Sequence, residues 1–208
     1  WRVLTCLMPS SRVTIIDDWY ALGLRGTGSK SVTLEAEFIP DHRIICMQET
    51  AGKGTPGQEI NPGSLFQGIP TSTLFAMVIT APALGLAEAA VEAFEERVAS
   101  RWNARMRNAQ TEWPASQARL GRAAARLKAT RAAFSTSVDA FSAQVEVGET
   151  PTVTQRTAYR MDMVEVVRQC TDVVYELFLD AGSGATMDSS PLQRIFRDIH
   201  TLRSHFVI

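Results

Sequence analysis

The spacing of hydrophobic residues along the chain changes near residue 50. Before this point, the segment "SVTLEAEFIP" (31–40) alternates apolar and polar residues, which is the period of a half-buried strand. The apolar positions of this alternation are Val32, Leu34, Ala36 and Phe38. Shorter apolar runs predict three further strands, in residues 1–9, 12–19 and 42–47. Residues 1–48 are therefore expected to be β structure.

A segment rich in glycine and proline follows the predicted strands. Residues 49–71 contain "ETAGKGTPGQEINPG", a composition typical of a connection between two structural units. Beyond it, apolar residues recur at the spacing of amphipathic helices. We therefore expect a connector at 49–71 and a helical domain at 72–208.

The first two helices of this domain are expected at 72–103 and 115–147. The apolar stripe of the first consists of Leu74, Met77, Val78, Ala81, Leu84, Val91, Phe94, Val98 and Trp102. The second repeats large residues at intervals of seven, with smaller ones between them: Leu120, Leu127, Phe134 and Phe141, then Ala124, Val138 and Val145. Such a repeat is typical of a helix-bundle seam. Arg131 interrupts the seam, and we expect it to be a buried ion-pair partner.

Two further helices complete the predicted bundle. The third, at 151–180, has Pro151 placed to fit its first turn. Its stripe consists of Val164, Val167, Cys170, Val174, Leu177 and Phe178. A short fourth helix begins at Pro191, with Ser190 as its N-cap. Four helices with one apolar stripe each predict a four-helix bundle, so the fold class is α+β.

The composition argues against some classes of function but does not identify one. The 208 residues carry a net charge of −1, which gives no electrostatic case for binding nucleic acid. No apolar run approaches the roughly 20 residues of a membrane span, and no signal peptide is recognised. Three separated cysteines suit a reducing compartment such as the cytoplasm, and without a CxxC pair they predict no metal site. Because the chain begins at Trp1 inside a predicted strand, we expect it to be the C-terminal part of a longer protein.

The glycine-rich stretch "GLRGTGSKSV" (23–32) is not a dinucleotide fingerprint. Its spacing is GxxGxG and a strand follows, whereas the fingerprint requires GxGxxG between a strand and a helix. A P-loop lysine pattern is also missing. From the residues alone, a conformational turn with an exposed arginine and a wall around a planar ligand both remain open.

Five pieces, in this order, resemble the acyl-CoA dehydrogenase superfamily. They are Trp19, "GLRGTGSKSV", "FIPDHR", the loop "AGSGA" (181–185) and the closing "PLQRIFRDIHTLRSH" (191–205). Within the superfamily the chain most resembles oxygenase components of two-component flavin-dependent monooxygenases. The resemblance implies that residues 1–48 are the second part of a central β-barrel domain and that the bundle follows it.

The end of the chain separates two branches of this superfamily. In the dehydrogenases an "RD" pair is followed about two turns later by a glutamate that removes the substrate α-proton. Arg197 and Asp198 match the pair, but no glutamate occurs after Glu176, and His205 stands near the expected place. The resemblance therefore favours the monooxygenases, which carry a histidine here beside the flavin. From its spacing alone, His205 would be read as a surface histidine.

The resemblance also implies the chemistry. Reduced flavin, FMN or FAD, would come from a separate flavin reductase and react with molecular oxygen to a C4a-hydroperoxide, which hydroxylates an aromatic or phenolic substrate. His205 would handle protons in this reaction, as imidazoles commonly do. A homotetramer and a role in aromatic catabolism are implied as well. The alternatives are an acyl-CoA dehydrogenase-like FAD oxidoreductase and a non-catalytic helical assembly module.

Seven further residues match positions that contact the cofactor in the superfamily. They are Arg25, Ser29, Arg101, Gln117, Gly182, Ser183 and Gly184. The loop at 182–184 resembles one that meets the phosphate-bearing tail of the flavin, often from a neighbouring subunit. As a bare motif it would be a helix C-cap. Arg194 and Arg197 could anchor either the last helix or its flavin loop, and the sequence does not separate these two roles.

Overall fold

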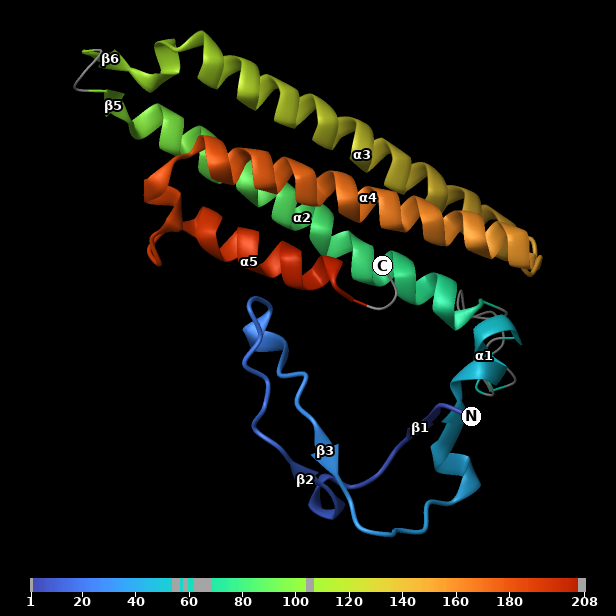
Figure 1. Ribbon diagram of the computed structural model, residues 1–208. Helices are drawn as coiled ribbons and strands as arrows, with labels where there is room; N and C mark the ends of the chain where they lie inside the picture. The colour runs from blue at the N-terminus through green and yellow to red at the C-terminus, as the bar shows by residue number, and fades with distance from the viewer. Residues whose placement is uncertain (1, 54–56, 58–59, 62–68, 104–106, 206–208) are drawn as a thin grey trace.

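Four helices lie side by side and form the body of the molecule in this computed structural model (Figure 1). The structure describes residues 2–53, 57, 60–61, 69–103 and 107–205. The bundle helices are α2 (Thr71–Ser100), α3 (Pro114–Glu146), α4 (Val153–Asp180) and α5 (Pro191–Arg203). The four predicted helices are thus confirmed, and each observed end lies within three residues of its predicted position.

The start of α4 differs from the prediction for a local reason. Thr152 is the N-cap: its side-chain oxygen accepts a hydrogen bond from the Gln155 N–H, and Gln155 Oε1 accepts one from the Thr152 N–H at 2.9 Å. This capping box satisfies free N–H groups at the helix start. Pro151 therefore lies before the cap and not in the first turn. On α5 the prediction is confirmed, with Ser190 at the N-cap and Pro191 in the first turn.

Small residues form much of the buried face of α2. Ala83, Ala87 and Ala90 are completely buried together with Phe94, where α2 packs against α4 and α5. Small side chains let helices approach closely, so large residues are not needed along this face. The two predicted stripes are partly wrong, since four of their members are exposed: Val78 and Ala81 on α2, Trp102 beyond the end of α2, and Ala124 on α3.

Two other expectations for the bundle are corrected. Arg131 forms an ion pair with Glu88 of α2, as predicted, but its side chain is exposed and not buried. In addition, α2 is long and apolar enough to cross a membrane by length and composition alone, with a mean hydropathy of 1.9 over 18 residues. The sequence reading missed this length of apolar chain. Because one face of α2 forms the bundle core, the helix also fits the core of a protein without a membrane.

The β segment consists of short antiparallel pairs. Strand β1 (Leu4–Cys6) pairs with β4 (Ile44–Cys46), and β2 (Thr14–Ile15) pairs with β3 (Val32–Thr33). A further pair, β5 (Trp102–Asn103) and β6 (Asn108–Ala109), follows α2. Among the described residues these pairs make separate two-stranded sheets, so the partial barrel remains a prediction.

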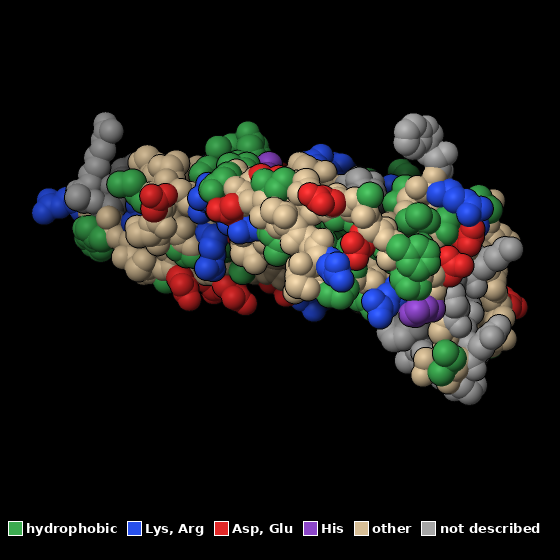
Figure 2. Space-filling model, turned by 90° about the horizontal axis from the view of Figure 1, so that it is seen from below, with side chains coloured by type: hydrophobic (Ala, Val, Ile, Leu, Met, Phe, Trp, Pro, Cys, Tyr) green, Lys and Arg blue, Asp and Glu red, His purple; other side chains and the backbone are tan. Residues whose placement is uncertain are grey.

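The long alternating strand predicted at 31–40 is the largest difference from the sequence analysis. Only Val32–Thr33 is a strand, and the expected buried face is exposed, with Phe38 at 88%. An alternating pattern gives a half-buried strand only where a second layer covers its apolar face. No described element covers this one, and hydrophobic side chains are visible at the surface among charged ones (Figure 2). Helix α1 (Met47–Lys53) occupies the start of the predicted connector, whose residues 54–56, 58–59 and 62–68 lie outside the described residues.

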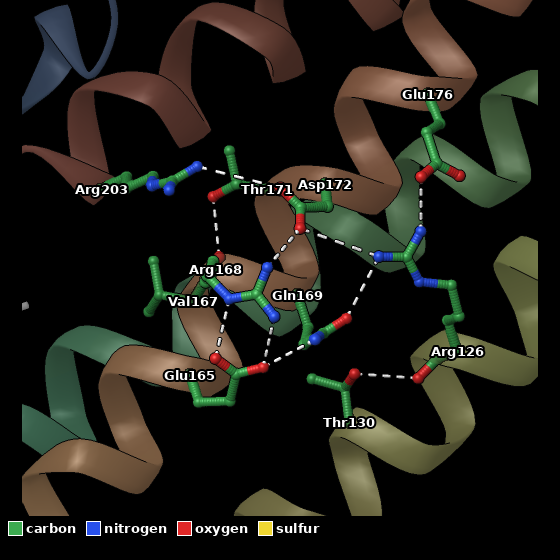
Figure 3. A network of polar contacts seen from close by, with 10 residues as sticks. All are labelled: Arg126, Thr130, Glu165, Val167, Arg168, Gln169, Thr171, Asp172, Glu176 and Arg203. Atoms are coloured by element: carbon green, nitrogen blue, oxygen red, sulfur yellow. Dashed lines mark hydrogen bonds and ion pairs between the residues drawn. The ribbon is translucent and has the colours of Figure 1, made fainter.

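A network of polar side chains joins α3, α4 and α5 along one edge of the bundle (Figure 3). Arg126 of α3 donates to Glu176 at 2.6 Å and to Gln169 at 3.2 Å, both on α4. Arg168 binds Glu165, and the hydrogen bonds from Arg168 and then Gln169 lower the pKa of Glu165 to about 2. Because these groups are largely exposed, the network orients the helices more than it stabilises them.

Candidate functional site

A glycine-rich turn at residues 23–27, called the glycine turn below, connects the N-terminal β segment (residues 2–53) to α5 through hydrogen bonds. The Gly23 N–H donates to Thr201 Oγ1 at 2.8 Å, and the Leu24 N–H donates to Asp198 Oδ1 at 2.7 Å. Gly23 is buried, and a Cβ at this position would lie 2.2 Å from the carbonyl oxygen of Arg197. Only glycine fits such a close approach of two backbones. Asp198 and Thr201 of α5 therefore hold the turn.

The predicted site residue Arg25 lines a cavity where the glycine turn contacts α5. The cavity has a volume of about 370 Å³ and lies between the turn and α5. Its lining consists of Gly23, Leu24, Arg25, Gly26, Thr27, Arg194, Arg197 and Asp198. The predicted residue Ser29 is exposed just outside this lining, with its hydroxyl 3.2 Å from that of Thr27. The two predicted residues of the turn are thus close together, and Arg25 alone faces the cavity.

The glycine loop at 182–184 connects α4 to α5 and is fixed by an arginine of α2. Arg97 Nε donates to the Ala181 carbonyl oxygen at 3.0 Å. A Cβ on Gly184 would lie 2.5 Å from Arg97 Nη2, so the loop passes directly over the guanidinium. Gly182 has φ +71°, a conformation that favours glycine. The sequence reading missed Arg97, because nothing in its spacing relates it to a loop more than 80 residues away.

Arg101 and Gln117 lie at the end of the bundle where the β5–β6 pair joins α2 to α3 (Figure 1). Both side chains are exposed. Gln117 Nε2 donates to the Thr111 carbonyl oxygen at 2.9 Å, and the Arg101 carbonyl oxygen accepts from the Gln110 N–H at 3.0 Å. The α4–α5 connection reaches the same end of the bundle, so the glycine loop and these two residues share it. Arg25 and Ser29 lie instead beside α5.

His205 follows the end of α5 and packs against α2. Its ring meets Phe75 edge-on, with ring centroids 5.7 Å apart, and its side chain is partly buried. His200 faces a different environment: its ring lies 4.1 Å from that of Phe196, and its Nδ1 is 2.7 Å from the Phe196 carbonyl oxygen. Because α5 ends at Arg203, the different directions of the two histidines are set by these contacts and not by a continuing helix.

A second cavity, of about 390 Å³, lies between the start of α2 and the end of α3. Its lining is mostly apolar, including Met77, Phe134 and Phe141, and it contains none of the predicted site residues. Within the described part of the chain, no group of three or more His, Cys, Asp or Glu side chains could hold a metal ion.

The family of the chain follows from its helical part. The model of the acyl-CoA dehydrogenase C-terminal domain matches residues 77–208, which is more than half of the chain. The chain belongs to this family. The match covers the bundle, including the glycine loop and α5, and leaves the β segment outside.

Named relatives extend the likeness over nearly the whole chain. It is 30% identical, over 96% of its length, to the flavin-dependent monooxygenase oxygenase subunit HsaA of Rhodococcus jostii (strain RHA1), of which it covers 52%. It is equally 30% identical, over 96% of its length, to the oxygenase component of p-hydroxyphenylacetate 3-hydroxylase of Acinetobacter baumannii, of which it covers 47%. A solved structure, XiaF from Streptomyces sp. in complex with FADH2 and glycerol, is similar with a TM-score of 0.87 and 25% identity, covering 98% of this chain and 51% of that one. The chain spans about half the length of the curated relatives it matches.

Proposed function

We propose that the protein containing this chain is the oxygenase component of a two-component flavin-dependent monooxygenase. It hydroxylates an aromatic or phenolic substrate with molecular oxygen and with reduced flavin from a separate reductase. The observation that carries the proposal is the histidine at position 205, in a family whose dehydrogenases place a glutamate near here. The likeness to named oxygenase components supports the same choice.

The residues of this chain suit a planar cofactor with a phosphate-bearing tail. At Gly184 the glycine loop presents bare backbone over the guanidinium of Arg97, as expected of a place that receives a phosphate. Gly182, Ser183 and Gly184 would hold the tail, with Arg101 and Gln117 at the same end of the bundle. Reduced flavin, when bound, supplies the electrons with which oxygen reacts.

His205 is proposed to move the proton that accompanies oxygen transfer. An imidazole nitrogen can take a proton from a phenol hydroxyl and return it later in the cycle. The edge-on contact with Phe75 restricts the ring, so that a nitrogen is presented in a defined direction. Packing of α2 against α5 therefore fixes the position of this nitrogen.

Assembly and location belong to the same proposal. The bundle exposes large apolar side chains on α2 and α4, namely Val78, Met161, Tyr175 and Leu179, which suits contact with further subunits in a homotetramer. Light scattering of the full-length gene product at micromolar concentration tests this, and a monomer would contradict it. We expect the protein in the cytoplasm, where a reductase can supply reduced flavin.

The decisive experiment compares two histidine variants of the full-length gene product. With reduced flavin, oxygen and a phenol, His205→Asn should form less hydroxylated product, by roughly a hundredfold, the usual contribution of a positioned acid or base. Hydrogen peroxide should rise correspondingly, while flavin affinity stays nearly unchanged. His200→Ala is the matched control, since His200 lies among Phe196 and Tyr175 and not against Phe75.

Four outcomes would contradict the proposal. If the coupling of oxygen use to product is unchanged in His205→Asn, or falls equally in both variants, His205 is structural. Oxidation of NADH by the purified protein alone would contradict the need for a reductase. Bleaching of bound flavin by an acyl-CoA would favour the dehydrogenase-like alternative.

A further inference from the structure

We infer that the cavity between α5 and the turn at residues 23–27 binds a compact oxyanion, a phosphate or a carboxylate. The inference concerns binding only, so it does not require that the protein hydroxylates anything. Three arginines line the cavity: Arg25 from the turn, and Arg194 and Arg197 from α5. The sequence links Arg25 to a ligand only by resemblance, and it leaves the two α5 arginines without a ligand role.

The charge of this cavity is unbalanced. Asp198 is the one carboxylate among its lining residues, and its Oδ1 already accepts the N–H of Leu24. Within the described part of the chain, no carboxylate forms an ion pair with any of the three guanidinium groups. Arg197 Nε is also buried without a hydrogen-bond partner. A buried donor without a partner is costly, and an anionic oxygen in the cavity would satisfy it.

Two of the three arginines, Arg25 and Arg197, are held in place before any ligand binds. Arg25 Nε donates to the Ala21 carbonyl oxygen at 2.8 Å, and Arg197 Nη1 donates to the Leu22 carbonyl oxygen at 3.3 Å. Each guanidinium has five N–H donors, so several remain for a ligand. Because the side chains are already oriented, binding loses less conformational entropy than it would with mobile arginines.

The space beside the Gly26 backbone also suits an anion. Gly26 has no atom within 4 Å of the place where a Cβ would stand, so a ligand can reach the backbone there. The volume of about 370 Å³ is enough for a phosphate ester or an aromatic carboxylate. Both ligands present two or more charged oxygens, which guanidinium groups bind in pairs.

The test uses inorganic pyrophosphate as the probe, titrated calorimetrically into the full-length gene product at low salt. Arg194→Gln is the main variant, because no hydrogen bond of its side chain supports the fold of the described residues. We expect it to weaken pyrophosphate binding by about tenfold, as loss of a charge-assisted pair does. Arg194→Lys should recover part of the loss. Arg203→Gln, on the same helix but outside the cavity and 3.9 Å from Asp172, should change nothing.

Two further pairs of titrations identify the source of the anion. If it is a flavin phosphate, Arg194→Gln should weaken FMN and leave riboflavin unchanged. If it is a substrate carboxylate, the variant should weaken 4-hydroxybenzoate and leave phenol unchanged. The inference is overturned if the wild type does not bind pyrophosphate or if Arg203→Gln loses as much as Arg194→Gln. It is also overturned if Arg194→Gln changes neither the binding of FMN relative to riboflavin nor that of 4-hydroxybenzoate relative to phenol, since the cavity would then hold an adventitious ion only.

Discussion

The bundle and the β segment differ most in how many of their residues are buried. Residues 71–205 enclose two core clusters, the larger of them around Phe94, whereas among residues 2–50 only Gly23 and Thr50 are buried. Gly23, the one buried residue of the glycine turn, donates a hydrogen bond to Thr201 of α5. The β segment therefore contacts the bundle at two places, the glycine turn beside α5 and Thr50 of α1 beside Thr71 of α2. Four predictions test this contrast, from the largest expected effect to the smallest.

Truncating a core residue of the bundle should have the largest effect. Phe94 is completely buried, so Phe94→Ala should lower the free energy of unfolding by about 3–5 kcal/mol. Phe38→Ala is the matched change in the β segment, where the ring is exposed, and it should stay within about 0.5 kcal/mol. Denaturant titration measures both. Similar losses for the two variants would show that the β segment is covered in solution.

Cysteine alkylation should separate the two regions chemically. Burial raises the pKa of the Cys170 thiol to about 12, so little reactive thiolate forms on α4 at neutral pH. Cys6, which is exposed in β1, should react with iodoacetamide at least about 100-fold faster in the native protein. Peptide mass spectrometry over time follows each site. Addition of denaturant should remove most of the difference, and a fast native reaction at Cys170 would mean that the core opens.

Changing the glycine turn should detach the β segment and leave the bundle folded. In Gly23→Ala the new methyl would meet the Arg197 carbonyl, and the strain should cost about 1–3 kcal/mol. Amide hydrogen exchange at Gly23 and Leu24 should become fast, while α2 and α4 stay protected. Gly26→Ala is the control, because its Cβ would meet no atom. Equal exchange in both variants would show that the contact of the glycine turn with α5 is not specific.

The smallest expected effect is a loss of stability at low pH. Because Arg168 and Gln169 lower the pKa of Glu165 from 4.5 to about 2, its contribution to stability is complete above pH 4.5 and is lost as the pH falls toward 2. Glu165→Gln should therefore be less stable than the wild type at pH 7 and equal to it near pH 2. Denaturation at a series of pH values measures this difference.

The sequence predicted the bundle well because its helices are amphipathic over many turns. Leu127 and Phe141, taken from the repeat at sevens, are indeed buried on α3. The β segment was predicted less well, because the alternation around Phe38 indicates a buried face only if something covers it. The site was the least predictable. Arg97 and Ala181 lie 84 positions apart, and Leu24 and Asp198 lie 174 apart, so no local pattern connects them.

The separation between Gly23 and Thr201 has a consequence for the order of folding. Their hydrogen bond joins residues 178 positions apart, so forming it closes almost the whole chain into a loop. Closing so long a loop loses much chain entropy unless the helices between have already shortened the path. The contact of the turn with α5 should therefore form after the helices have packed. Because Thr201 is synthesised 178 positions after Gly23, the glycine turn lacks this acceptor while the helices between them are being made.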